Sequence, residues 1–248
     1  MFVFPMAGLS RRFTEAGHDR PKYMLQAHGR SLFAHAVGGF SAYFATHPFL
    51  FIARDVAGTP HFVQEECARL GIAQARLVLL EAPTAGQAET VALGLVRAEV
   101  PDATPLTLFN IDTFRPGFRH PTAFAVEGPQ AVDGYLEVFR GSGPNWSYVR
   151  PDPVQPGRVR ATTEKVPVSD LCCTGLYHFR SAGLFLHAYR RFAAGEAAAM
   201  GLRELYVAPM YNLLLRGAAD VRYHLIHPDT VIFCGVPAEY EAFLAADP

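Results

Sequence analysis

Short apolar runs alternate with segments of helical periodicity through the first half of the chain, and this alternation strongly limits the possible folds. The apolar runs cover residues 2–4, 49–53, 77–80 and 106–111. Between them lie segments 31–44, 59–70 and 88–96, in which apolar residues recur at helical spacing. Continuous apolar strands separated by helices are typical of parallel strands that are buried on both faces. We therefore predict an α/β fold of three α/β/α layers, Rossmann-like, with a mixed, mainly parallel central sheet.

The second half of the chain changes character, because Gly- and Pro-rich turns separate its apolar runs. The pattern in this half predicts further strands and helices that complete the same sheet and form one wall of a cleft. The expected strands are 134–140, 147–150, 159–162, 175–179, 221–226 and 231–234, and the expected helices are 182–194, 201–216 and a last one after Pro237. A chain of 248 residues is of the size that one elaborated α/β core can hold, so we expect one domain.

The charge balance excludes several classes of partner. The chain carries 22 Lys and Arg against 23 Asp and Glu, a net charge of -1, so no bulk basic field attracts nucleic acid or anionic lipid. No apolar run approaches the roughly 20 residues that span a bilayer. The first residues place apolar side chains before positive ones, which is the reverse of a secretory signal, and this order predicts a cytoplasmic protein. The four cysteines form no CxxC pair and are expected to be buried thiols.

A loop of small residues that ends in two arginines directly follows the first predicted strand. Small residues let backbone N–H groups approach an anion, and guanidinium groups bind phosphate as forks. The alternative is a tight turn with two solvated arginines, and the segment matches neither a P-loop nor a dinucleotide fingerprint. The residues of this candidate phosphate loop are Ala7, Gly8, Leu9, Ser10, Arg11 and Arg12, and Pro21-Lys22 follows shortly after. Lys22 and Lys165 are the two lysines among the 22 basic residues, which suggests sites that need a compact ammonium.

Three more places combine chemistry with position. Asp112 ends the fourth apolar run, where a carboxylate is costly unless it is paired or bound to a metal such as Mg²⁺; the alternative is a turn or helix cap. Thr84 and Gly86 lie in the turn before the third helix, with Thr84 a possible cap and Gly86 leaving room for a flat ring, unless this is an ordinary turn. Glu164 and Lys165 are adjacent, and their plain interpretation is a surface ion pair.

Taken together, these segments resemble the nucleotidyltransferases that make nucleotide sugars, the glucose-1-phosphate thymidylyltransferase type of pyrophosphorylase. The resemblance extends in order and rough spacing over nearly the whole chain. The segments that carry it are Ala7–Phe13 with Pro21-Lys22, Pro83–Ala88, Asn110–Asp112, Glu164-Lys165 followed by Cys173–Phe179, and Cys234–Pro237.

The resemblance implies a GT-A-like fold, with a nucleotide-binding half in residues 1–115 and an acceptor-binding half in residues 116–248. It implies an enzyme of nucleotide-sugar and polysaccharide biosynthesis that transfers a nucleoside monophosphate from a nucleoside triphosphate to a sugar phosphate and releases pyrophosphate. By resemblance, loop 7–12 cradles the triphosphate with Arg12 on the leaving pyrophosphate, Lys22 lies at the α-phosphate, and Asp112 holds Mg²⁺. Thr84 and Gly86 would contact the nucleotide. Glu164, Lys165 and Gly175 would bind the acceptor.

Two positions depart from the family pattern. Ser10 stands where the family has a second glycine, and serine is strained there if the backbone needs a positive φ. Phe233 stands where the family has a second metal-binding aspartate, so that ligand is missing or comes from elsewhere, for example from Asp229 or Asp170.

Two alternatives to the nucleotidyltransferase remain at this point. One is a glycosyltransferase on the same scaffold that uses a nucleotide sugar, and the other is an inactive nucleotide-binding homologue. Two arginines and the Pro21-Lys22 pair favour a triphosphate, which has more charge to neutralise. The base, the acceptor and the formation of a homo-oligomer are left open by the sequence.

Overall fold

The computed structural model describes residues 1–246, and its contacts group into two compact units. The N-terminal unit contains residues 2–83, 109–119 and the segment from 229 onward. The central unit contains Met1 and residues 84–108 and 120–228. Segment 84–108 therefore groups with most of the second half of the sequence. The single domain with halves 1–115 and 116–248 stays a prediction.

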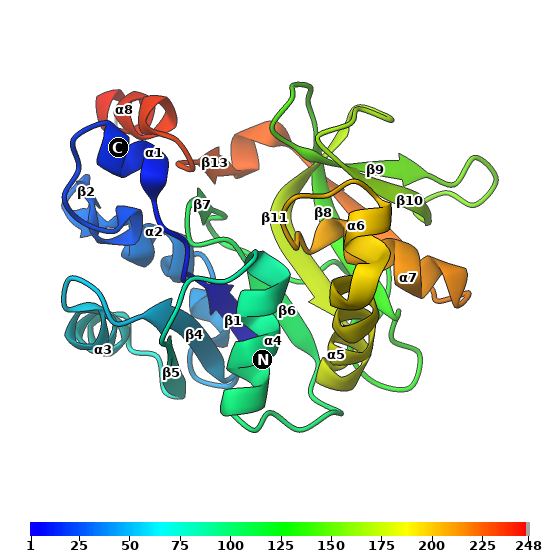
Figure 1. Cartoon of the computed structure of the whole chain (residues 1–248), viewed down its shortest axis with the longest axis horizontal. Helices are drawn as coiled ribbons and strands as arrows, with labels where there is room; N and C mark the ends of the chain where they lie inside the picture. The colour runs from blue at the N-terminus through cyan, green and yellow to red at the C-terminus, as the bar shows by residue number, and fades with distance from the viewer. Residues whose placement is uncertain (247–248) are drawn as a thin grey trace. The chain divides into compact units, whose positions relative to one another are not determined.

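Three parallel strands form the sheet of the N-terminal unit (Figure 1). They are β1 (Phe2–Pro5), β4 (Phe49–Arg54) and β5 (Ala75–Leu80), with β4 in the middle. Phenylalanine rings stack from strand to strand: Phe2 lies on Phe49 and Phe4 on Phe51, with centroids 5.1 and 5.4 Å apart. Buried aromatic ladders of this kind explain why the first two strands are continuous apolar runs in the sequence.

The helices of this unit begin where local chemistry allows. Ser31 caps α2 (Leu32–Gly38), because its Oγ accepts the Ala34 N–H at 3.0 Å. Helix α3 (Thr59–Leu70) is capped by Gly58 and not by Thr59, whose hydroxyl donates to the Val56 carbonyl at 2.6 Å. The helix predicted over 31–44 stops at a Gly-Gly pair, and a single 3₁₀ turn, η2 (Ser41–Tyr43), follows.

Shorter elements complete the N-terminal unit. Antiparallel pairs join β2 to β3 and β7 to β13, and the 3₁₀ turn η5 (Pro228–Thr230) precedes β13. Tyr240 of α8 packs against Phe13 of α1 and donates its hydroxyl to the Gln26 carbonyl at 2.8 Å. The bounds are α1 (Arg11–Glu15), η1 (Lys22–Met24), β2 (Gln26–Ala27), β3 (Arg30–Ser31), β7 (Thr113–Phe114), β13 (Ile232–Phe233) and α8 (Pro237–Ala245).

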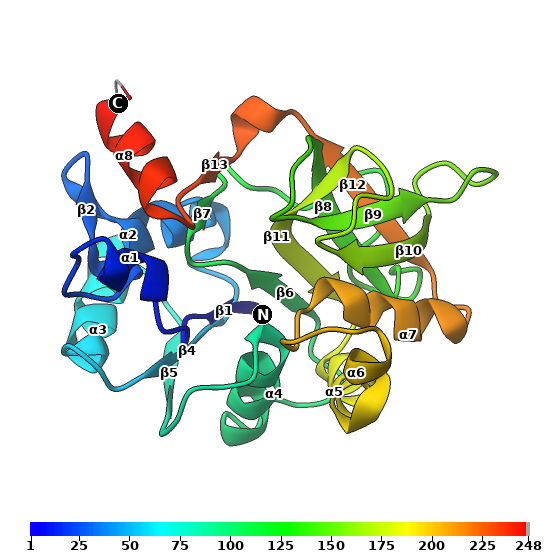
Figure 2. The ribbon, with the colours of Figure 1, turned by 45° about the horizontal axis from the view of Figure 1, so that its top comes forward.

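The central unit contains a mixed group of strands (Figure 2). Strand β11 runs antiparallel to β8, β8 parallel to β12, and β9 antiparallel to both β10 and β11. Strand β11 begins four residues earlier than predicted and is buried along its length. The bounds are β6 (Leu106–Phe109), β8 (Gly134–Arg140), β9 (Ser147–Pro151), β10 (Val159–Glu164), β11 (Leu171–Phe179) and β12 (Val221–Ile226).

The helix predicted over 201–216 is wrong in its first half. Residues 202–207 form an irregular segment, because the backbone of Leu205 bonds to Ala85 and Ala88 and so is not available to a helical ladder. The helices of this unit are α4 (Gln87–Arg97), α5 (Ala182–Arg191), the π-helical turn η3 (Phe192–Glu196), α6 (Ala197–Ala199), η4 (Ala208–Met210) and α7 (Tyr211–Arg216). In residues 1–246, no helix is long and apolar enough to cross a membrane.

Candidate active site

The loop after β1 ends in a residue with a left-handed backbone. Ser10 adopts a left-handed conformation, φ 52° and ψ 29°, at the start of α1. Its hydroxyl accepts the backbone N–H of Lys22 at 3.3 Å, which ties the loop to the Pro21-Lys22 turn. Around Gly8 there is open space, since a Cβ built there meets no atom within 4 Å. The strain that the sequence predicts at Ser10 is therefore present, and a hydrogen bond offsets part of it.

Lys22 and Asp112, which are 90 positions apart in the sequence, meet in this unit. The Lys22 ammonium donates to Asp112 Oδ2 and forms an ion pair with it. The two side chains are 22% and 19% exposed, so a ligand can still reach them. The sequence predicts that Asp112 ends strand β6, and this is wrong. Strand β6 ends at Phe109, and Asp112 lies in the turn that follows. A partly exposed ammonium and carboxylate beside this loop can offer a cation to an anionic ligand and a hard oxygen to a metal ion.

Arg11 and Arg12 occupy the first turn of α1, immediately after Ser10. Both are exposed, and within residues 1–246 neither guanidinium group has a hydrogen-bond or ion-pair partner. They remain available to an anion that enters from solvent. The structure thus joins three predicted residues, Ser10, Lys22 and Asp112, and places the two arginines on the helix that starts at Ser10.

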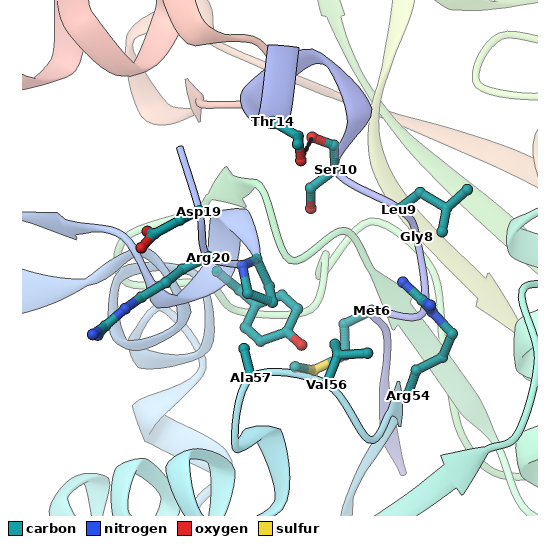
Figure 3. Close-up of a pocket in the computed structure, with 12 residues that line it drawn as sticks. Met6, Gly8, Leu9, Ser10, Thr14, Asp19, Arg20, Arg54, Val56 and Ala57 are labelled. Atoms are coloured by element: carbon teal, nitrogen blue, oxygen red, sulfur yellow. Dashed lines mark hydrogen bonds between the residues drawn. The ribbon is translucent and has the colours of Figure 1, made fainter. Parts of the chain in front are cut away.

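Arg54 is a residue of this site that our sequence analysis missed. It ends β4, and its Nε donates to the Ala7 carbonyl at 3.0 Å. Figure 3 shows its guanidinium group reaching toward the loop at Gly8 and Leu9, on the wall of a cavity of about 320 Å³. A charged residue at the end of an apolar strand was the available signal.

A second carboxylate lies close to Asp112. Gly235 separates the two: a Cβ built on it would lie 3.2 Å from Asp112 Oδ2 and 3.6 Å from Glu239 Oε2. Glu239 Oε2 accepts the Gly235 N–H at 2.8 Å and the Val236 N–H at 3.2 Å, so it also caps α8. Burial, together with these two carboxylates, raises the pKa of Cys234 to about 12 and keeps it a thiol. Glu239 was not among the predicted residues.

The donor set near Asp112 fits Mg²⁺ bound largely by water and phosphate. Mg²⁺ takes one or two carboxylates and hard oxygen ligands, and Asp112 with Glu239 beside it offers these. In the part of the chain that the structure describes, no three His, Cys, Asp or Glu side chains gather as a metal-binding group. Phe233, which stands where the family has a second metal-binding aspartate, pairs with Thr113 between β13 and β7. Asp170, named above as a possible source of that ligand, forms an ion pair with Arg140.

In the central unit, the turn before α4 is built differently from the expectation. Thr84 does not cap the helix; its hydroxyl donates to the Gly86 carbonyl at 3.1 Å and bonds to Thr90. The Glu89 carboxylate instead accepts the Ala85 N–H. Gly86 has φ 152°, and its open side is filled by a backbone segment: a Cβ there would lie 2.6 Å from the nitrogen of Leu205. This side of the glycine therefore has no room for a flat ring.

Glu164 and Lys165 are more than a surface pair. The Glu164 side chain is 6% exposed and accepts a hydrogen bond from Ser147. Burial raises the pKa of Glu164, and the Ser147 bond and Lys165 oppose that rise. Lys165 is half-exposed, its Nζ lies 3.9 Å from Glu164 Oε1, and it donates to the Tyr206 hydroxyl at 2.7 Å. Its backbone is left-handed, φ 59°, which a lysine adopts only when its surroundings hold it.

Gly175, the remaining predicted acceptor residue, lies in an irregular stretch of β11. The pairing of β11 with β8 shifts between Cys173 and Tyr177, and Gly175 has φ 95° there. Opposite this bulge lies Glu137, a fully buried carboxylate that accepts the Thr174 hydroxyl at 3.2 Å. Glu137 and Tyr206 were not predicted, since nothing in the periodicity distinguishes them from core or loop residues.

Comparison with solved structures defines the class of the fold as that of the nucleotidyltransferases, a mixed central sheet with flanking helices, which confirms the predicted fold class. The inositol-1-phosphate CTP transferase of T. maritima is similar with a TM-score of 0.72 at 14% identity, over 98% of this chain and 92% of that one. A UTP-bound UGPase from Acinetobacter baumannii is similar with a TM-score of 0.64 at 13% identity, over 98% and 91%.

A nucleoside-diphosphate-sugar pyrophosphorylase from Vibrio cholerae RC9 shares 49% sequence identity, with a TM-score of 0.93 over 99% of this chain and 100% of that one. The chain therefore belongs to the nucleoside-diphosphate-sugar pyrophosphorylase family of nucleotidyltransferases. Neither the protein-family models nor the curated proteins gave a match.

Proposed function

We propose that this enzyme transfers a nucleoside monophosphate from a nucleoside triphosphate to a sugar phosphate, depends on Mg²⁺ and acts in the cytoplasm in nucleotide-sugar and polysaccharide biosynthesis. The contact between Lys22 and Asp112 is the observation that carries the proposal; it lies beside a loop with two arginines whose guanidinium groups have no partner within residues 1–246. This arrangement suits a polyphosphate, because cations meet its oxygens while a carboxylate offers a hard ligand to its metal.

The reaction needs no covalent intermediate on the protein. An oxygen of the acceptor's phosphate attacks the α-phosphorus of the triphosphate and forms a new O–P bond. The bond between the α-phosphorus and the oxygen that bridges it to the β-phosphorus breaks, and pyrophosphate leaves with that oxygen. The chain's contribution is to align the two groups and to neutralise their charge. Mg²⁺, held by Asp112 with Glu239 beside it, would supply further charge neutralisation on the phosphate oxygens.

The proposal gives each predicted residue a role. Loop 7–12 receives the triphosphate, with Arg12 on the leaving group and Lys22 released from Asp112 to the α-phosphate. Thr84 and Gly86 shape the turn on which the nucleotide lies. Glu164 accepts hydrogen bonds from the acceptor's hydroxyls, Lys165 binds its phosphate, and Gly175 leaves room for it.

The first experiment incubates the protein with the common nucleoside triphosphates, Mg²⁺ and a panel of phosphorylated sugars and amino alcohols, and measures pyrophosphate. We expect release that depends on both substrates and stops with EDTA. Release of a nucleoside diphosphate from a nucleotide sugar would favour the glycosyltransferase instead. Thermal stabilisation by nucleotides without any turnover would favour the inactive homologue.

Asp112→Asn tests the centre of the site. Loss of one preorganised charged group should lower kcat by about 10²–10³-fold. Glu241→Gln, an exposed carboxylate on α8, is the matched control and should leave kcat within about twofold. Turnover of Asp112→Asn at the wild-type rate would reject the proposed role of this residue.

A further inference from the structure

One irregular segment of the central unit touches two parts of the proposed site. We name residues 202–207 the linking segment. The Leu205 N–H donates to the Ala85 carbonyl at 2.9 Å, and the Ala88 N–H donates to the Leu205 carbonyl at 2.8 Å. Two backbone hydrogen bonds in opposite directions fix this segment against the turn that precedes α4. Gly86 is required between them, because any side chain there would collide with the Leu205 backbone.

The next residue of the same segment, Tyr206, holds the Lys165 ammonium. The Nζ donates to the tyrosine hydroxyl at 2.7 Å and lies 4.7 Å from the centre of its ring. Glu164 Oε1 lies 3.9 Å from the same nitrogen. The Lys165 backbone is pinned as well, since its N–H donates to the Trp146 carbonyl at 2.9 Å. Lys165 is thus held at both ends while about half of its side chain stays exposed.

Holding a lysine in this way changes what it costs to bind a ligand. A free lysine side chain loses much rotational freedom when its ammonium is fixed on a phosphate. Tyr206 fixes it in advance. An ammonium group has three N–H donors. The tyrosine hydroxyl accepts one of them, and the Glu164 carboxylate, at 3.9 Å, is beyond hydrogen-bond distance, so donors remain for an incoming oxygen.

We propose that Tyr206 is a positioning residue that holds the Lys165 ammonium in place for the phosphate of the acceptor. The proposal rests on the proposed function, which makes Lys165 the ligand of that phosphate. Through Leu205, the linking segment also joins the contact between Tyr206 and Lys165 to the turn before α4, on which the nucleotide is proposed to lie. One stretch of chain would then support the sites of both substrates.

The kinetic test compares Tyr206→Phe with Tyr223→Phe. The first variant loses the hydroxyl and keeps the ring, and the second removes a tyrosine hydroxyl on β12 that has no hydrogen-bond partner among the described residues. We expect Tyr206→Phe to raise KM for the acceptor about three- to tenfold, which is the range that corresponds to the loss of one ordinary hydrogen bond. We expect kcat and the KM for the triphosphate to stay within twofold. The proposal would be overturned if the two variants had equal KM values for the acceptor, or if Tyr206→Phe raised the KM for the acceptor and the KM for the triphosphate equally.

A chemical test works without turnover, because the chain has two lysines and peptide mass spectrometry resolves them. The hydrogen bond with Tyr206 is the largest cause that raises the pKa of Lys165. Tyr206→Phe should therefore speed acetylation of Lys165 by acetic anhydride several-fold and leave Lys22 unchanged. Glucose 1-phosphate should protect Lys165 better in the wild type than in the variant.

The two tests separate the failure of this proposal from that of the proposed function. If the wild type releases no pyrophosphate with any acceptor, the proposed function fails while the acetylation rates still report on the contact. If turnover is present but Lys165 reacts equally fast in the wild type and Tyr206→Phe, the positioning role is wrong. Should Tyr206→Phe not fold, Tyr206→Met also removes the hydroxyl, with a flexible apolar side chain, and serves in both tests.

Discussion

Ser10 combines a strained backbone with a useful hydroxyl, and two substitutions separate these effects. Ser10→Gly relieves a left-handed strain of about 1–2 kcal/mol, but it loses the acceptor for the Lys22 N–H and adds chain entropy, so its net effect should be near zero. Ser10→Ala keeps the strain and loses the hydrogen bond.

We expect urea unfolding to show Ser10→Ala about 1 kcal/mol less stable than the wild type, and less stable than Ser10→Gly. If alanine is tolerated as well as glycine, the left-handed conformation does not matter for stability.

Glu164 carries a charge that burial opposes, and its replacement should reveal this. Its pKa is raised in the folded protein, so its contribution to stability is present at low pH and is lost as pH rises through that raised pKa. Glu164→Gln removes the charge and can still accept the Ser147 hydrogen bond. The variant should gain stability relative to the wild type as pH rises from 4 to 7, and it should lose activity. A stability difference that does not change with pH would contradict this.

At the scale of the elements, the linking segment depends on a glycine in another element. A Cβ at Gly86 would lie 2.6 and 2.7 Å from the Leu205 nitrogen and oxygen, at a φ of 152°. Gly86→Ala should therefore lower the free energy of unfolding by about 2–4 kcal/mol, through a collision and a strained backbone. Gly8→Ala is the matched control, since its Cβ meets nothing, and should change stability by about 0.5 kcal/mol or less. Similar values for the two variants in urea unfolding would exclude the packing argument.

The elements also show how far local pattern reaches. Apolar runs predicted β1, β4 and β8 within one residue or so, because buried strands need continuous apolar side chains. The pattern failed over 202–207, where an apolar spacing looks helical but the backbone bonds to a turn more than a hundred residues away. No local signal reports such a partner.

At the scale of the whole molecule, acid should weaken the fold through a buried histidine. His178 on β11 has a pKa lowered to about 3 by burial and, less, by His120. Between pH 6.5 and about 3 the unfolded chain binds a proton at this site that the folded chain does not, so stability falls as pH falls, by up to about 1.4 kcal/mol per pH unit. His178→Gln should show a shallower fall in urea titrations between pH 7 and 5. Parallel curves for the two proteins would show that this histidine does not set the acid limit.

What the sequence by itself determined is the order of strands and helices, the small-residue loop with its arginines, and the candidates Lys22, Asp112, Glu164 and Lys165. Those follow from periodicity and from residue chemistry, which are local properties. Only the tertiary structure decided that Lys22 meets Asp112, that Glu239 stands beside them, that Arg54 supports Ala7 and that Tyr206 holds Lys165. The residues that meet in this way lie up to 127 positions apart in the sequence. The fold brings them together, and a short stretch of sequence cannot contain both members of such a pair.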